Sequence, residues 1–228
     1  MTEDTTTFST DRIKALTDGV IAIVITLLVL ELTVPVVSEI PGSEGLWPEL
    51  RGLWRETLGY AVSFFLVGLL WLYHHNVFRY VRRANGTLLT LNVFFLFAVS
   101  ITPFSSALVT ANPNERLAAI IYGSSVFLAA ASNAAMFAYA SWRRRLVDPR
   151  LQGRFIRREN RSAMVILVVL AAGAGLGYIG SAYTYAVLGV AIAYYWVMTA
   201  LNREGVSAAR RGEHVAVPME SGGEDDTG

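Results

Sequence analysis

Six apolar stretches of roughly 20 residues dominate this 228-residue sequence, and a helix needs about 20 mainly apolar residues to cross the bilayer core. Only 16% of the residues are charged, against roughly 25% in soluble domains. The sequence lacks the apolar and polar alternation of a membrane β-barrel. It therefore predicts an all-α polytopic membrane protein with six transmembrane helices, over Ala15–Val34, Leu58–Phe78, Leu88–Thr110, Leu117–Trp142, Ser162–Gly180 and Tyr183–Leu201.

Basic residues are divided very unequally between the loops on the two sides of these helices. Sixteen lie before the first span, after the sixth, or in the loops that follow the second and fourth spans, and eight of them fall within 143–161. The other side has only Arg51, Arg55 and Arg116. The positive-inside rule then predicts a multi-pass protein of the cell membrane with both termini in the cytoplasm.

Three segments differ in composition. Residues 1–10 are polar and acidic, which predicts a short cytoplasmic N-terminus followed by a retained helix rather than a cleaved signal peptide. Residues 11–203 form the predicted transmembrane domain. Residues 204–228 have few large apolar side chains, which predicts a disordered cytoplasmic tail. The basic loop 143–161 favours lipid contact over nucleic-acid binding, because no separate folded module accompanies it.

Polar residues inside the spans are the candidate functional residues, because each costs free energy in hydrocarbon unless it has a partner or reaches water. The pair His74-His75 suggests a metal site. However, adjacent helical residues point about 100° apart, which favours a hydrogen-bonding role. Cysteine is absent, and neither a GxSxG nor an HExxH motif occurs. We expect no enzyme activity, no cofactor and no metal beyond a permeating ion.

Glycines near residue 175 match two motifs. The segment 175–180 fits GxGxxG, but it lies within an apolar helix without the strand that a dinucleotide site requires. Gly177-Tyr178 lacks the preceding Thr-Val of a potassium-channel TVGYG filter. Gly173 and Gly177 instead have the spacing of a close helix–helix contact.

The first span carries the stripe Ile23, Leu27 and Leu30, with Thr26 beside it. Such a stripe alone is typical of helix packing or lipid contact. Asp18 before it and Glu31 after it would concentrate cations at both ends of an apolar constriction, and such constrictions gate by dewetting. One helix cannot surround a pore, so this alternative requires a symmetric oligomer with the first helix at its axis.

The segment from Arg12 to Glu31 resembles the first-helix signature of the transmembrane protein 175 family, which are potassium channels without a TVGYG filter. The segment from Trp71 to Phe78 looks like a further mark of that family, as do Asn92 and Pro103-Phe104. Leu16-Thr17-Asp18 stands where the family has Phe-Ser-Asp.

The resemblance implies a potassium-conducting homotetramer of single six-helix chains. It makes Ile23, Leu27 and Leu30 the pore constriction and assigns selectivity to Thr26 together with Ile23. Glu31 would lie at the outer pore mouth. The resemblance also implies a polar network of Arg12, Thr17 and Asp18 with His74 or His75.

A proton-coupled secondary transporter is the alternative, with Asp18 and a second-span histidine as a proton relay. Transporters often contain internal repeats and helices interrupted near the midplane. No convincing repeat relates residues 1–114 to 115–228. A channel is therefore the favoured prediction.

Overall fold

A computed structural model describes residues 9–36, 45–142, 146–149, 151 and 153–194. The chain divides into two compact units, 1–192 and 193–228. Ala193 and Tyr194, the described residues of the second unit, end a helix that begins at Ser181. The predicted tail 204–228 lies outside the described residues, as do the first eight residues of the predicted N-terminus.

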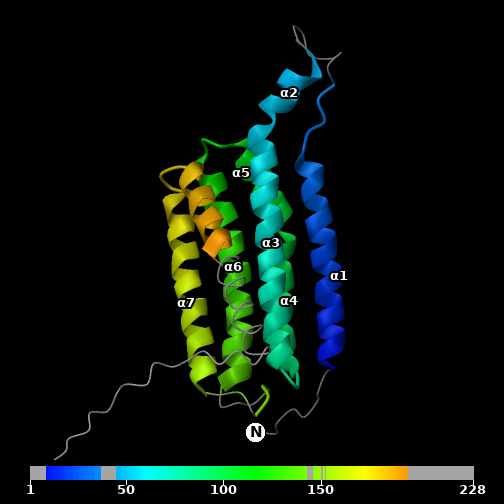
Figure 1. Ribbon diagram of the computed structural model, residues 1–228, viewed down its shortest axis with the longest axis vertical. Helices are drawn as coiled ribbons and strands as arrows, with labels where there is room; N and C mark the ends of the chain where they lie inside the picture. Colours follow the sequence, from blue (N-terminus) through cyan, green and yellow to red (C-terminus); the bar gives the residue numbers. More distant parts are fainter. Residues whose placement is uncertain (1–8, 37–44, 143–145, 150, 152, 195–228) are drawn as a thin grey trace, which may run out of the picture. The chain divides into compact units, whose positions relative to one another are not determined.

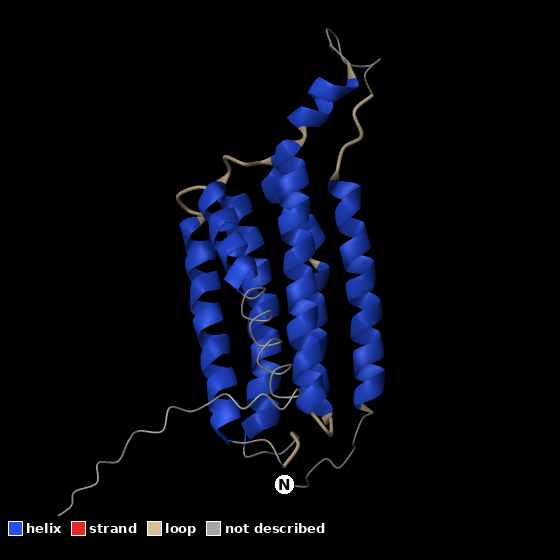
Figure 2. Cartoon of the chain, in the orientation of Figure 1, coloured by secondary structure: helices blue, strands red, loops and turns tan. Residues whose placement is uncertain are grey.

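The described residues form helices joined by short loops (Figures 1 and 2). Within the part of the chain that the structure describes, five spans are long and apolar enough to cross a membrane, in agreement with the predicted multi-pass, all-helical architecture. In chain order the elements are α1 (Thr10–Leu28), η1 (Val29–Glu31), α2 (Leu46–Gly52), α3 (Trp54–Tyr80), α4 (Gly86–Ser100), α5 (Thr102–Ala111), α6 (Arg116–Ser141) and α7 (Gly153–Leu176).

The helix Ser181–Tyr194 corresponds to the predicted sixth span, and the remainder of that span lies outside the described residues. Two further differences from the prediction are an additional short helix and an earlier start of one helix. The short helix α2 lies in a loop for which no helix was expected. In addition, α7 begins at Gly153, nine residues before the predicted Ser162, so Arg154, Arg157, Arg158 and Arg161 are helical. Hydropathy marks only the apolar part of a helix, and α7 extends beyond that part.

The third predicted span consists of two consecutive helices, α4 and α5. Thr102-Pro103 begins α5 directly after Ile101, where α4 ends. Proline has no N–H to donate, and its ring clashes with the carbonyl oxygen four residues earlier, which is that of Val99. This divides the helix while keeping both parts within the span Gly86–Ala111.

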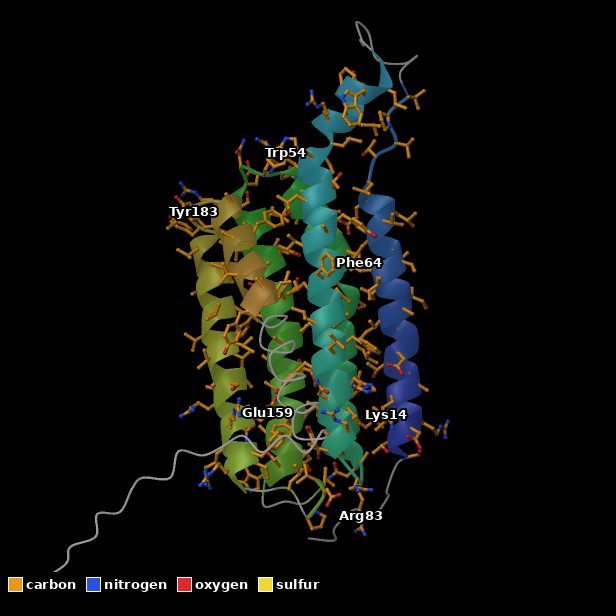
Figure 3. The ribbon with its side chains drawn as sticks, in the orientation of Figure 1. Lys14, Trp54, Phe64, Arg83, Glu159 and Tyr183 are labelled. Carbon is orange, nitrogen blue, oxygen red and sulfur yellow. The ribbon has the colours of Figure 1, made fainter. Side chains whose placement is uncertain are left out.

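The loops after α3 and α6 are held together. Val81 and Val147 form an antiparallel bridge, and the Arg82 N–H donates to the Leu146 carbonyl at 2.8 Å. The Arg82 guanidinium also bonds the Asp148 carboxylate at 2.6 Å. Figure 3 shows Lys14, Arg83 and Glu159 toward one end of the bundle and Trp54 and Tyr183 toward the other, so we call these the Lys14 end and the Trp54 end.

Candidate functional site

Helix α1 has one packed face and one exposed face. Its buried residues recur every three or four positions and pack against α3 and α4; they are Ile13, Thr17, Ile21, Val24 and Leu28. Lipid tails are as apolar as these side chains, so van der Waals contact and polar bonds hold the helix in a membrane. The rotation of α1 about its axis therefore decides which side chains are left for a pore or a partner.

The predicted constriction residues all lie on exposed positions of α1 and of η1, which follows it. The exposed fractions of Ile23, Leu27 and Leu30 are 60%, 44% and 76% in the single chain. Thr26 lies among them and is also exposed. Its hydroxyl donates to the Ile23 carbonyl oxygen at 2.8 Å. Because the hydroxyl hydrogen is used within the helix, the oxygen is left as an acceptor that can face a cation.

Thr17 and His74 meet at Asn92 on α4. The Thr17 hydroxyl donates to Asn92 Oδ1 at 3.3 Å, and Asn92 Nδ2 donates to that hydroxyl at 3.2 Å. His74 Nε2 lies 2.8 Å from the same Oδ1 and is its donor, because a carbonyl oxygen only accepts. All three side chains are buried. The His74 ring is stacked on Phe78 and Phe95, with centroid distances of 4.6 and 5.1 Å.

Asp18 has a different partner from the one that the sequence suggests. The indole N–H of Trp71 donates to Asp18 Oδ1 at 2.7 Å. Arg12 is exposed and forms no hydrogen bond or ion pair within the described part of the chain. His75 is exposed and lies beside Trp71, with ring centroids 5.7 Å apart. The structure thus brings Thr17 and His74 together, places Asp18 beside α3, and leaves Arg12 at the surface.

Glu31 ends η1, three residues after the fully buried Leu28, and its side chain is half-buried. One carboxylate oxygen, Oε1, is buried without a hydrogen-bond partner among the described residues. The neighbouring Leu30 is instead strongly exposed, so the two side chains leave the helix on different sides.

Sequence reasoning did not assign a site role to Asn92 or Trp71, or to Ser63 and Ser106, whose buried hydroxyl oxygens lie 2.8 Å apart. Polar side chains within apolar spans were the available signal for Asn92 and the serines. Trp71 carried no such signal, because tryptophan is ordinary in a membrane helix. Among the described residues, no group of three or more His, Asp or Glu side chains is arranged to hold a metal ion.

Comparison with known proteins relates this site to a family. The family model described as "Endosomal/lysosomal potassium channel TMEM175" matches residues 12–103, which include most of α1 and all of α3 and α4. A potassium channel of Streptomyces collinus is 31% identical over 188 residues, covering 81% of this chain and 90% of that protein. A potassium channel of Chamaesiphon minutus is 39% identical over 125 residues, covering 54% of this chain and 61% of that protein.

The fold is also similar to a solved structure. The crystal structure of a lysosomal potassium-selective channel TMEM175 homologue from Chamaesiphon minutus superposes with a TM-score of 0.73 at 27% identity. The match covers 83% of this chain and 97% of that chain. Sequence and fold therefore agree over most of the length of the chain, which belongs to the TMEM175 channel family.

Proposed function

We propose that the chain is the subunit of a potassium channel and that α1 lines its pore. The observation that carries this proposal is the division of α1 into two faces. One face packs within the subunit, and the other presents Ile23, Thr26 and Leu27 outward, followed by the exposed Leu30 in η1. The membership of the chain in a channel family supports assigning this exposed face to conduction.

The proposed assembly is a homotetramer in which the sixth span continues past Tyr194. A single lining helix cannot surround a pore, so several copies must meet at a common axis. The helix Ser181–Tyr194 is apolar, and the sequence remains apolar as far as Leu201. A sixth span returns the chain to the Lys14 end, where the positive-inside rule places the cytoplasm of the cell.

In the proposed tetramer, the four copies of each pore-facing residue form a ring around the axis. The rings of aliphatic residues and the ring of Thr26 hydroxyl groups act differently. Rings of Ile23, Leu27 and Leu30 restrict the width and the wetting of the pore, but they offer no ligand to an ion. The Thr26 oxygen is a side-chain acceptor within this stripe, since its hydrogen is donated to Ile23. Potassium rearranges its hydration more readily than sodium, so this oxygen ring favours potassium, with Ile23 setting the width beside it.

Recording from the purified protein in planar bilayers tests the function. With potassium on one side and sodium on the other, we expect a passive current that reverses toward the potassium equilibrium potential. Ion flux that saturates and requires a proton gradient would instead establish the carrier alternative. Asp18 bonds Trp71 and His74 bonds Asn92, and within the described residues no hydrogen bond joins Asp18 to His74. The geometry therefore does not favour a relay between them.

A further inference from the structure

The first turns of α7 carry a dense group of exposed positive charges. Four arginines and one acidic residue, Glu159, lie in this segment and give it a net charge of +3. The arginine side chains are exposed and form no hydrogen bond or ion pair with another described residue; they are Arg154, Arg157, Arg158 and Arg161. The described part of the chain therefore supplies no counter-charge in direct contact with these guanidinium groups.

Three of these arginines line up with aliphatic side chains on the surface of the helix. At about 100° per residue, Arg154, Arg158 and Arg161 fall within an arc of about 60°. Val165 and Val168, which are 57% and 65% exposed, continue the same line within about 80°. The buried residues of α7 point to other sides. These five residues, which we call the α7 stripe, form one exposed surface that is cationic at the Lys14 end and aliphatic further along the helix.

Packing of neighbouring side chains fixes the direction of the stripe. The Phe155 ring of α7 lies 5.0 Å from the Tyr80 ring of α3, measured between centroids. Ile156 packs against the same hydrophobic core. Because Phe155 and Ile156 hold the other side of this turn against the bundle, the stripe faces outward. Figure 1 shows α7 on the opposite side of the bundle from α1, so the stripe is also remote from the proposed pore.

The length of α7 places the stripe across the boundary between hydrocarbon and headgroups. The helix has 24 residues and rises about 36 Å, which exceeds the roughly 30 Å of a hydrocarbon core. Its apolar part, after Arg161, rises only about 22 Å. Arg161 therefore lies at the edge of the hydrocarbon, and Arg154 lies about 10 Å further out. An arginine at that depth extends its side chain toward the headgroups and costs free energy unless its charge has a partner there.

The two chemical halves of the stripe match the two halves of an anionic phospholipid. A guanidinium group donates two parallel N–H bonds to phosphate oxygens. Arg158 and Arg161 are three positions apart and therefore neighbours on the helix surface, so both can reach one phosphate. A free phosphate ion would use only the cationic half. A nucleic acid or an acidic peptide would leave the valines unused, because they lie at the depth of the acyl chains.

We propose that the α7 stripe binds one anionic phospholipid from the leaflet at the Lys14 end. Arg158 and Arg161 hold its phosphate, and Arg154 extends the positive surface along the headgroup. An acyl chain lies along Val165 and Val168. The site is separate from the proposed pore, so the proposal stands whether or not the protein conducts potassium. It turns the lipid contact expected of the basic loop into one defined site.

Nanodiscs of phosphatidylcholine that contain a small fraction of brominated lipid locate the bound molecule. The sequence has no cysteine, so Val165→Cys can carry a single fluorophore, which bromine on a nearby acyl chain quenches. We expect brominated phosphatidylglycerol to quench it several-fold more than brominated phosphatidylcholine at the same fraction. Val93→Cys, at a similarly exposed valine of α4, is the matched control, and the two lipids should quench equally there. Equal quenching at position 165 would overturn the proposal.

Thermal unfolding in a neutral detergent tests the arginines. A lipid that binds the folded protein raises its melting temperature. We expect phosphatidylglycerol to raise it by several degrees more than phosphatidylcholine does. The double variant Arg158→Gln/Arg161→Gln should lose more than half of that difference. The double variant Arg51→Gln/Arg55→Gln removes the same charge from exposed arginines at the Trp54 end and should keep the difference.

Two results of the unfolding experiment would contradict the proposal. An equal loss in both double variants would show that the lipid responds to the total charge of the protein rather than to the stripe. A rise with inorganic phosphate as large as that with phosphatidylglycerol would show a site for free anions, to which Val165 and Val168 contribute nothing.

Discussion

The Thr26 side chain combines two roles in one hydroxyl group. Its hydrogen is donated to the Ile23 carbonyl within the same helix, and its oxygen remains exposed. A serine or threonine bonded in this way satisfies its donor locally, which a membrane-facing or pore-facing helix requires. The same geometry leaves an acceptor among aliphatic neighbours. A substitution that removes only the hydroxyl oxygen of Thr26 therefore tests its proposed role in selectivity.

We expect Thr26→Val to lower the potassium-to-sodium permeability ratio, because valine has nearly the same shape and lacks the oxygen. The reversal potential under bi-ionic conditions measures this ratio. Leu27→Ala is the control for pore width and should mainly raise the leak current. An unchanged reversal potential in Thr26→Val would assign selectivity to the aliphatic side chains alone.

Asn92 of α4 forms hydrogen bonds with side chains of two other helices. Its amide bonds Thr17 of α1 and His74 of α3, and all three groups are buried. Asn92→Ala leaves both partners without their hydrogen bonds, so we expect a loss of about 1–3 kcal/mol in unfolding free energy. Reversible unfolding in mixed detergent micelles measures it. Ser100→Ala on the same helix removes an exposed, local bond to Phe97 and should change little.

At the scale of elements, small residues control how closely the helices approach. Gly123 of α6 faces the Ala174 backbone of α7, and a Cβ at that glycine would lie 2.7 Å from the Ala174 Cα. Gly173 faces Val187 of the helix Ser181–Tyr194 in the same way, at 2.9 Å. Such contacts let backbones approach in a membrane, where packing replaces the hydrophobic effect. The close packing expected of the Gly173 and Gly177 motif is thus present.

Gly123→Val should push α6 and α7 apart and destabilise the subunit by about 1–3 kcal/mol, the usual cost of overpacking. Gly175→Val is the matched control on α7, because a Cβ there meets nothing within 4 Å. Melting temperatures of the two purified variants give the comparison. Equal shifts would show that the separation of these helices is not limited by Gly123.

At the scale of the whole molecule, the other described helices cover only one face of α1. Helix α1 packs mainly on α3 and α4, and its other side is exposed in the single chain. The remaining helices pack mainly on one another, with α6 contacting α4, α5 and α7. In the proposed channel, α1 would serve as the lining and the other helices would support it.

Cross-linking tests the assembly as a whole. Leu27→Cys should form disulfide-linked dimers between subunits, because equivalent α1 helices meet at the proposed axis. Val165→Cys, on the exposed side of α7, is the control and should remain monomeric under the same oxidation. A monomeric mass in mild detergents and in lipid nanodiscs would contradict the tetramer.

The sequence by itself determined the membrane class and the approximate positions of the spans, because the hydrocarbon thickness sets a length and a composition that are local along the chain. It also marked Asp18, Glu31, His74 and Asn92 as polar groups in need of partners. Only the tertiary structure decided those partners. Thr17 and Asn92 are 75 positions apart, and Trp71 and Asp18 are 53 apart. Which side chains meet over such separations depends on how each helix is rotated about its axis, and the same rotation leaves Ile23 and Leu27 exposed while Ile21 and Leu28 are buried. Hydropathy carries no direct information on that angle, since packing among all the helices fixes it together.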